Sequence, residues 1–252
     1  ITGGSLGLGL AMATEFARSG ATVAILGRTQ ATLDEAVASI AAEAPEATVQ
    51  AFACDVRDAA ALTATHEQVV AAMGPVDILV NNAGGAGDLQ PMVDLSDEAF
   101  DEAMKWNVYG TFYATRRALR GMIDRKWGRV INMSSMEGKH GKPVFTAYTA
   151  AKHAINGMTK SLAREVGEVG VTANCICPGL VITDIIKNNG PDTAEAMGMT
   201  FDEMITMFSQ ESAIKRPNTV EEIAAMALLL ASDEGAGITG AMLSVDGGTA
   251  QY

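Results

Sequence analysis

The segment Thr2-Gly3-Gly4-Ser5-Leu6-Gly7-Leu8-Gly9 opens an apolar, helix-like stretch and carries four glycines in eight positions. Glycine is needed where a backbone turns sharply and approaches an anion with no Cβ in the way. A helix N-terminus then offers unpaired N–H groups and a partial positive charge, so the segment predicts a phosphate-binding turn. Such a turn normally follows a complete strand. Only Ile1 precedes it here, so the first strand is expected to be truncated, with roughly 5–12 upstream residues absent.

Apolar, β-branched runs alternate with Ala-rich amphipathic stretches along the rest of the chain. Continuous apolar strands indicate a sheet covered on both faces, and strand–helix alternation indicates parallel pairing. The sequence predicts one doubly wound α/β (Rossmann) domain over residues 1–252, with about seven parallel strands and helices on both faces. The predicted strands are residues 22–26, 49–54, 76–80, 129–133, 171–177 and 242–245 plus the truncated first one, and the predicted helices are residues 10–19, 31–43, 59–73, 97–125, 147–166 and 220–231.

Residues 184–210 differ from this alternation because they form an insertion rich in methionine and phenylalanine. A stripe of Met at helical spacing is often plain core, but an insertion between a strand and the last helix is also a place for an adaptable lid over a pocket. Both interpretations stay open. The apolar residues concerned are Met197, Met199, Phe201, Met204, Met207 and Phe208.

Composition excludes several classes of protein. The net charge of −12 repels nucleic-acid phosphates and anionic lipid surfaces, and no apolar run is long enough to span a membrane. The chain shows no secretion signal, and its odd number of cysteines (Cys54, Cys175 and Cys177) is typical of buried free thiols in a cytoplasmic protein. The three histidines have no metal-ligand spacing, so no catalytic metal is expected.

Three further motifs follow the glycine turn in order along the chain. Asn81-Asn82-Ala83-Gly84 follows the predicted strand that ends at Val80, and Pro178-Gly179 follows a later one. Between them, Ser135 lies thirteen positions before the tyrosine of Tyr148-Thr149-Ala150-Ala151-Lys152. From Thr2 to the terminal Val245-Asp246-Gly247-Gly248, the chain resembles the short-chain dehydrogenase/reductase family. The resemblance implies a nicotinamide cofactor and hydride transfer between a carbonyl and an alcohol.

The resemblance also implies where the cofactor lies. It places Asp55 and Val56 against the adenine, Asn82 near the adenosine ribose, and Val181 and Thr183 beside the nicotinamide. The residues expected to contact the cofactor are Gly3, Ser5, Leu6, Leu8, Arg28, Thr29, Asp55, Val56, Asn82, Tyr148, Lys152, Val181 and Thr183.

The end of the second predicted strand indicates which nicotinamide cofactor is used. A carboxylate there would bond the ribose 2′-hydroxyl of NAD, but this chain has Gly27-Arg28-Thr29. Arg28 can pair with a 2′-phosphate through its planar guanidinium, so NADP(H) is predicted. The alternative interpretation of Arg28 is an exposed residue at the start of a helix.

Hydride transfer needs an acid/base beside the carbonyl, and Tyr148 and Lys152 lie four apart on one face of a predicted helix. The resemblance implies that Tyr148 exchanges the proton and that Lys152 holds the cofactor ribose. It further implies that Ser135 bonds the substrate oxygen and that Asn107 anchors a water relay to the lysine. To work near neutrality, the tyrosine pKa should fall by roughly 2–3 units, which a neighbouring ammonium and an oxidised nicotinamide both favour. Asn81 is expected to tie neighbouring strands together.

Several alternatives compete with a reductase of a small-to-medium hydrophobic carbonyl. A non-catalytic cofactor-binding regulator usually lacks an active-site residue, and enoyl reductases of the family space tyrosine and lysine more widely. The closest rival is a 3-oxoacyl-carrier-protein reductase, which tends to carry a basic residue where this chain has Glu168 and Val169. The resemblance also implies a homo-oligomer, a tetramer or dimer, built through the two long helices and the C-terminal strand.

Overall fold

Parallel strands form the centre of the computed structural model, which describes residues 1–196 and 198–250. Every strand pair is parallel, and the hydrogen-bonded order is β2-β1 in one part of the sheet and β3-β4-β5-β6 in the other. The six strands among the described residues are β1 (Val23–Gly27), β2 (Val49–Ala53), β3 (Ile78–Asn81), β4 (Gly128–Met133), β5 (Val171–Pro178) and β6 (Met242–Val245).

The two parts of the sheet are joined through Thr2, which forms isolated bridges with Leu26 at the end of β1 and with Asn81 of β3. Only Ile1 and Thr2 lie in this place, and two residues are too short to pair along the whole length of both neighbours. A cavity of about 710 Å³ therefore lies between β1 and β3. The described residues therefore form six strands, against the about seven predicted.

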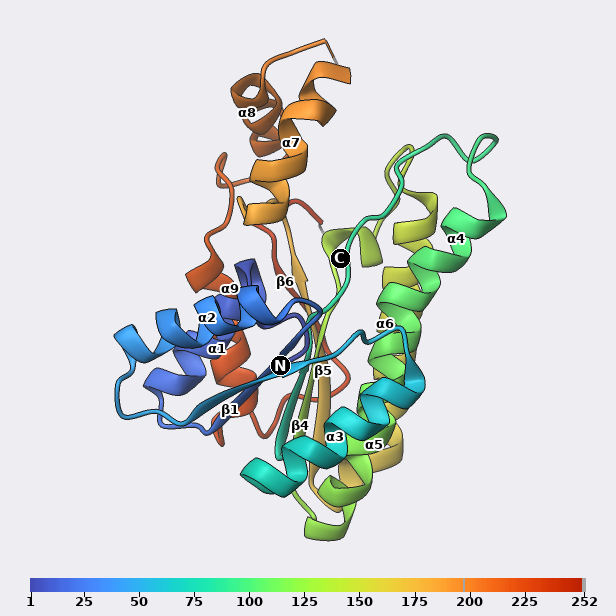
Figure 1. Cartoon of the computed structure of the whole chain (residues 1–252). Coiled ribbons are helices and arrows are strands. Elements are labelled where there is room, and N and C mark those ends of the chain that lie inside the picture. The colour runs from blue at the N-terminus through green and yellow to red at the C-terminus, as the bar shows by residue number, and fades with distance from the viewer. Residues whose placement is uncertain (197, 251–252) are drawn as a thin grey trace.

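Helices cover both faces of the sheet, with α1, α2 and α9 on one side and α3, α5 and α6 on the other (Figure 1). The largest apolar core fills the first side around Met12, Ile25 and Leu230, all fully buried. The helices are α1 (Gly7–Arg18), α2 (Gln30–Glu43), α3 (Ala59–Met73), α4 (Asp97–Met104), α5 (Gly110–Arg125), α6 (Thr146–Val166), α7 (Asp184–Ala196), α8 (Phe201–Glu211) and α9 (Val220–Ala231).

The region predicted as one helix over residues 97–125 contains an irregularity. A π-helical turn, Lys105–Tyr109, separates α4 from α5 without breaking the continuous run of helical residues. Such turns widen a helix locally and often occur at functional sites. This one sets the direction of Trp106 and Asn107.

The insertion 184–210 forms α7 and α8, which stand beyond the end of the sheet where the strands finish (Figure 1). A capping box between Thr200 and Glu203 starts α8. Met204 is buried and Met207 is 38% exposed, so the methionine stripe is part core and part surface. Met197, which belongs to the predicted stripe, lies outside the described residues. The lid role of this segment stays a prediction.

Candidate active site

A pocket of about 280 Å³ lies at the carboxyl ends of the strands, and the glycine-rich turn forms one of its walls. Gly3 and Gly7 have φ angles of +62° and +53°, a conformation that favours glycine. A Cβ on Gly9 would lie 2.0 Å from the carbonyl oxygen of Gly3, so the turn could not pack against α1 with any other residue there. Gly3, Ser5, Leu6 and Leu8, the residues of the turn expected to contact the cofactor, all line the pocket.

The first turn of α1 leaves its backbone N–H groups without a side-chain cap. Leu6 occupies the N-cap position in an extended conformation, and its side chain accepts no hydrogen bond. Uncapped N–H groups at a helix start, opening on a pocket, form a place for an anion such as a phosphate. The glycine turn thus fits the pyrophosphate of a dinucleotide.

Asn82 holds the turn in place rather than standing free in the pocket. Its Nδ2 donates to the carbonyl oxygen of Gly3 at 2.9 Å, and its backbone N–H donates to the hydroxyl of Thr2 at 3.0 Å. Asn82 also lines the pocket, as expected for a residue near a ribose. The neighbouring Asn81 donates to Asn132 Oδ1 at 2.8 Å, and it therefore ties β3 to β4 as predicted.

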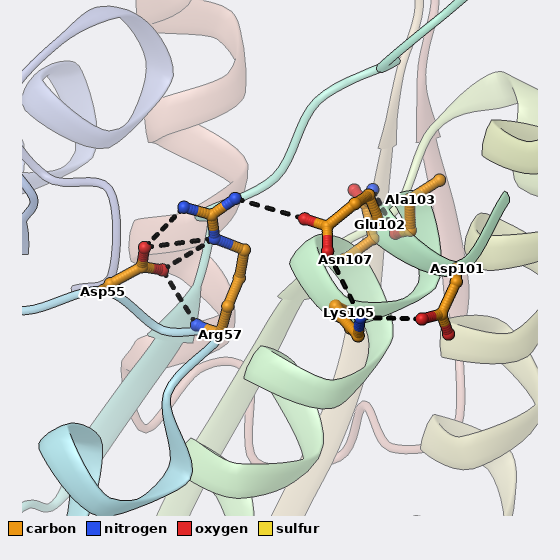
Figure 2. Close-up of polar contacts among 7 residues, drawn as sticks. All are labelled: Asp55, Arg57, Asp101, Glu102, Ala103, Lys105 and Asn107. Carbon is orange, nitrogen blue, oxygen red and sulfur yellow. Dashed lines mark hydrogen bonds and ion pairs between the residues drawn. The ribbon is translucent and has the colours of Figure 1, made fainter. Parts of the chain in front are cut away.

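Arg28 and Asp55 border one end of the pocket, together with Val56, but their surroundings differ. Asp55 is bonded to Arg57, with 2.6 Å between Nη2 and Oδ2, and this pairing holds the pKa of the Asp55 carboxyl below its usual value. Figure 2 shows Arg57 between Asp55 and Glu102, with 3.3 Å from Nη1 to the Glu102 carboxylate. Arg57 is thus paired with two carboxylates.

Arg28 is exposed, and its guanidinium carbon lies 5.7 Å from the centre of the Trp106 ring, which also lines the pocket. Thr29 is not among the lining residues; it is the N-cap residue of α2, and its carbonyl oxygen accepts from the Thr32 hydroxyl at 3.0 Å. The sequence analysis missed Arg57, Glu102 and Trp106, because their positions depend on contacts between distant segments.

Ser135, Tyr148 and Lys152 meet where β4 ends and α6 begins. Tyr148 lies beside the Ser135 side chain, and the Ser135 Oγ accepts from the Glu137 backbone N–H at 3.1 Å. The Lys152 ammonium lies 5.4 Å from the centre of the Tyr148 ring and donates to the carbonyl oxygen of Met133 at 2.8 Å. Tyr148 and Lys152 line the same pocket as the glycine turn.

The environment of this cluster shifts two pKa values. Burial raises the pKa of Tyr148 to about 12, against a lowering effect of the Ser135 hydrogen bond, and the nearby Glu137 carboxylate adds to the increase. Burial lowers the pKa of Lys152 to about 8. The expected fall in the tyrosine pKa is therefore not produced by these residues, because burial outweighs the lowering effect of Ser135.

Asn107 is fully buried next to this cluster. Its Nδ2 donates to Gly85 at 3.0 Å and to Ala103 at 2.9 Å, the second contact being drawn in Figure 2. Its Oδ1 accepts from the Gly85 N–H at 3.3 Å. A Cβ on Gly84 would lie 2.4 Å from this Oδ1 and 3.7 Å from the Lys152 ammonium, so Asn107 and Lys152 border the same glycine. The water relay itself stays a prediction.

Thr183 and Val181 follow β5 on the other side of the pocket. Thr183 lines the pocket, and its side chain comes within 3.3 Å of the place a Cβ on Gly7 would take. Val181 is buried and forms a bridge with Asn218, and it is not among the lining residues. The sequence analysis also missed Glu137, a buried carboxylate 3.2 Å from the His140 ring.

Within residues 1–196 and 198–250, no group of His, Cys, Asp and Glu side chains is arranged to hold a metal ion. In the same residues, no helix has the length and apolar character needed to cross a membrane. Cys54, Cys175 and Cys177 are buried and unpaired.

Comparison with known proteins places these features in a family. A family model described as enoyl-(acyl carrier protein) reductase matches residues 3–250. The chain is 37% identical to a D-beta-hydroxybutyrate dehydrogenase of Rhizobium meliloti (strain 1021), covering 100% of this chain and 98% of that protein. It is 36% identical to a monensin polyketide synthase putative ketoacyl reductase of Streptomyces virginiae, covering 100% and 96%. A crystal structure of a variant actinorhodin polyketide ketoreductase with NADPH has a TM-score of 0.95 at 30% identity, covering 100% and 96%.

Proposed function

This chain belongs to the short-chain dehydrogenase/reductase family, and we propose that it is an NADP(H)-dependent oxidoreductase that interconverts a ketone or aldehyde and an alcohol. One observation carries the proposal. A single pocket is lined at one wall by an uncapped glycine turn and at another by Tyr148 and Lys152. An anion site and a proton-transfer group therefore share one cavity, as transfer of hydride from a dinucleotide to a carbonyl requires.

The residues divide the chemistry among them. Ser135 Oγ already accepts from the Glu137 N–H, so its own hydrogen is free to point to the substrate oxygen and stabilise negative charge there. Tyr148 gives its phenolic proton to that oxygen in reduction and takes it back in oxidation. Lys152 donates to Met133 with one of its three N–H groups and keeps two for ribose hydroxyls. The bound cofactor supplies the hydride and, when oxidised, a positive ring that favours the phenolate.

The cofactor end of the pocket supports NADP(H) over NAD(H). Asp55 is neutralised by Arg57, so no free carboxylate from it repels a 2′-phosphate. Arg28 borders the pocket as an exposed cation. A protein of the same fold is known with NADPH at 30% identity. We assign the phosphate contact to Arg28.

The substrate we favour is a small-to-medium hydrophobic carbonyl. Ile185 of α7 lines the pocket and is 53% exposed, which gives the entrance an apolar surface. An acyl-carrier protein is acidic, and this chain carries a net charge of −12, with Glu168 and Val169 just before β5. The alternative function is reduction of a 3-oxoacyl thioester on such a carrier. Binding measured with and without the carrier protein distinguishes the two substrates.

The test is a kinetic screen of ketones and secondary alcohols with NADPH, NADH and their oxidised forms, followed by the absorbance of the reduced nicotinamide. We expect turnover of at least one ketone and a higher kcat/KM with NADPH. An equal or better value with NADH contradicts the cofactor assignment. Binding of NADPH without turnover of any carbonyl or alcohol instead favours a cofactor-binding regulator.

We also propose that the protein works as a cytoplasmic homo-oligomer, a tetramer or a dimer. The outer side of α4 and α5 exposes large apolar rings: Phe100 is 39%, Tyr109 41% and Phe112 44% exposed. The three cysteines are unpaired, which agrees with a reducing compartment. Light scattering and cell fractionation test these two assignments separately.

A further inference from the structure

Arg28 borders the pocket, and Arg57 is bonded to Asp55, which borders the pocket at the same end. The partners of the two arginines differ. Arg57 is held by Asp55 and Glu102, and Glu102 is shared with Lys105 at 3.2 Å (Figure 2). Among the residues that the structure describes, Arg28 makes no ion pair within 4.0 Å; its guanidinium carbon lies 5.7 Å from the centre of the Trp106 ring. The charge of Arg57 is therefore compensated by carboxylates of the protein itself, while the charge of Arg28 remains available to a ligand.

The Trp106 ring packs closely against the backbone at Gly85. A Cβ on Gly85 would lie 2.7 Å from Cη2 of the ring, so only glycine at position 85 leaves room for it. The π-helical turn Lys105–Tyr109 carries Trp106, and its neighbour Asn107 is bonded to Gly85 through both its amide nitrogen and its oxygen. The indole thus rests on backbone that is itself held by hydrogen bonds.

Contact with an aromatic ring restricts the conformations that an exposed arginine side chain samples. A free arginine side chain samples many rotamers, and each is lost when it grips a ligand. A guanidinium lying on an indole keeps its face against the ring while its N–H groups, which lie in the guanidinium plane, stay free at the edge. That edge is the part that pairs with a phosphate through two parallel hydrogen bonds.

We propose that Trp106 is a positioning residue that holds Arg28 ready for a phosphate on the 2′-oxygen of an adenosine, and so sets the preference for 2′-phosphorylated ligands. The juxtaposition of Gly85, the Trp106 ring and Arg28 on one wall of the pocket carries this inference. It rests on the proposed use of NADP(H) and adds the residue that determines it.

The experiment uses ligand fragments, so that it does not depend on turnover. Adenosine 2′,5′-bisphosphate and adenosine 5′-monophosphate, which differ only in the 2′-phosphate, are titrated calorimetrically into the full chain. We expect Trp106→Leu to weaken binding of the bisphosphate about five-fold and to leave the monophosphate unchanged. Trp106→Phe keeps an aromatic face and should restore most of the loss, and Gly85→Ala should reproduce the Leu effect by displacing the ring.

Trp127 provides the matched control, because its ring also lies under an arginine, with 4.4 Å to Arg129, but away from this pocket. Trp127→Leu should leave the ratio of the two affinities unchanged. An equal loss of both fragments in Trp106→Leu, or an unchanged ratio, overturns the positioning role. If the unmodified protein itself fails to prefer the bisphosphate, the proposed cofactor preference is wrong instead, and the two failures are thereby distinguished.

Discussion

At the scale of single residues, Lys152 combines a role in the chemistry with a cost to folding. Its ammonium is buried, and burial lowers its pKa to about 8 from the ordinary value of 10.5. The difference corresponds to about 3 kcal/mol of destabilisation at neutral pH. Below about pH 8 the amine is charged in both states and the full cost is present. Between pH 8 and 10.5 the folded protein is neutral while the unfolded chain still binds the proton, so the cost fades as pH rises.

Lys152→Met is therefore expected to inactivate the protein and to stabilise it. Loss of the hydrogen bond to the Met133 carbonyl offsets part of the gain, so we expect a net increase of about 1–2 kcal/mol in the free energy of unfolding at pH 7. The increase should shrink toward pH 10. Urea unfolding at several pH values, at one protein concentration, measures it. A variant that is less stable than the unmodified protein at pH 7 would show that the ammonium contributes more than it costs.

Tyr148→Phe removes the proton that the mechanism transfers and little else. We expect kcat to fall by orders of magnitude, because phenylalanine has no proton to transfer, while the affinity for NADPH stays within about two-fold. Fluorescence titration with NADPH and steady-state kinetics measure the two quantities. Retention of the original turnover would mean that another group performs the proton transfer.

The candidate residues of the reaction could be proposed from the sequence through the family resemblance, because the motifs that carry it are short and local. Tyr148 and Lys152 lie one helical turn apart, and the glycine turn is a continuous segment. The tertiary contacts around these residues could not be predicted in the same way. Arg57 and Glu102 are 45 positions apart, and the contact of Arg28 with Trp106 joins the segment after β1 to the π-helical turn Lys105–Tyr109. The acidity of Tyr148 also depends on burial, which no spacing reveals.

At the scale of elements, a buried chain of amides and hydroxyls links the sheet to the helices on one face. Asn132 of β4 accepts from Asn81 of β3 at 2.8 Å and donates to Thr159 of α6 at 2.8 Å. Asn81 also donates to Thr115 of α5 at 2.9 Å. This series of hydrogen bonds thus fixes the register of β3 against β4 and the positions of α5 and α6 on the sheet.

Asn132→Ala should reduce the free energy of unfolding by about 2–4 kcal/mol, because it removes two buried hydrogen bonds and leaves one N–H of the Asn81 amide without an acceptor. Asn188→Ala, at an exposed position of α7, is the matched control and should change stability by less than about 0.5 kcal/mol. Denaturant midpoints of the three proteins give the comparison. A small effect at Asn132 would indicate that water replaces the lost amide.

Lys142, in the loop that precedes α6, contacts the segment α7–α8. Its ammonium lies 4.1 Å from the centre of the Phe208 ring and 3.4 Å from the Glu211 carboxylate, both on α8. We expect Lys142→Met to release the segment, raising KM several-fold with a smaller change in kcat and speeding chymotryptic cleavage within residues 184–211. The exposed Lys187→Met on α7 is the control. Unchanged cleavage and KM in Lys142→Met would count against a lid.

The order and type of the elements followed from the alternation of apolar runs and helical stretches, whereas their irregularities did not. Residues 97–125 have helical character throughout, and nothing in that pattern marks the π-helical turn at Lys105–Tyr109. Gly110 follows it, and a Cβ there would lie 2.9 Å from Val56. The close approach of α5 to the loop after β2 is a tertiary requirement, so it is invisible to periodicity.

At the scale of the whole molecule, the doubly wound architecture was predictable because it follows from a general rule of parallel sheets and helical crossovers. The interruption between β1 and β3 follows from Thr2 alone bridging them. The way copies assemble is different, since it depends on surface shape. The face formed by α4, the π-helical turn and α5 carries the aromatic group Tyr109, Phe112 and Tyr113. The ring centre of Tyr113 lies 6.2 Å from that of Tyr109 and 5.9 Å from that of Phe112.

This aromatic group is expected to be the contact between two copies of the chain. In a two-fold dimer the same face meets itself, so one substitution acts on both copies. Phe112→Asp replaces a ring that is 44% exposed with a carboxylate, which would lie in an apolar interface near its counterpart from the second copy and lose its water. The mass in solution should then fall to half that of the unmodified protein or to the monomer, as measured by light scattering. Leu229→Asp, 39% exposed on α9 at the other side of the sheet, introduces the same charge and should leave the mass unchanged. An unmodified protein that is monomeric, or a Phe112→Asp variant of undiminished mass, would exclude this face as the contact.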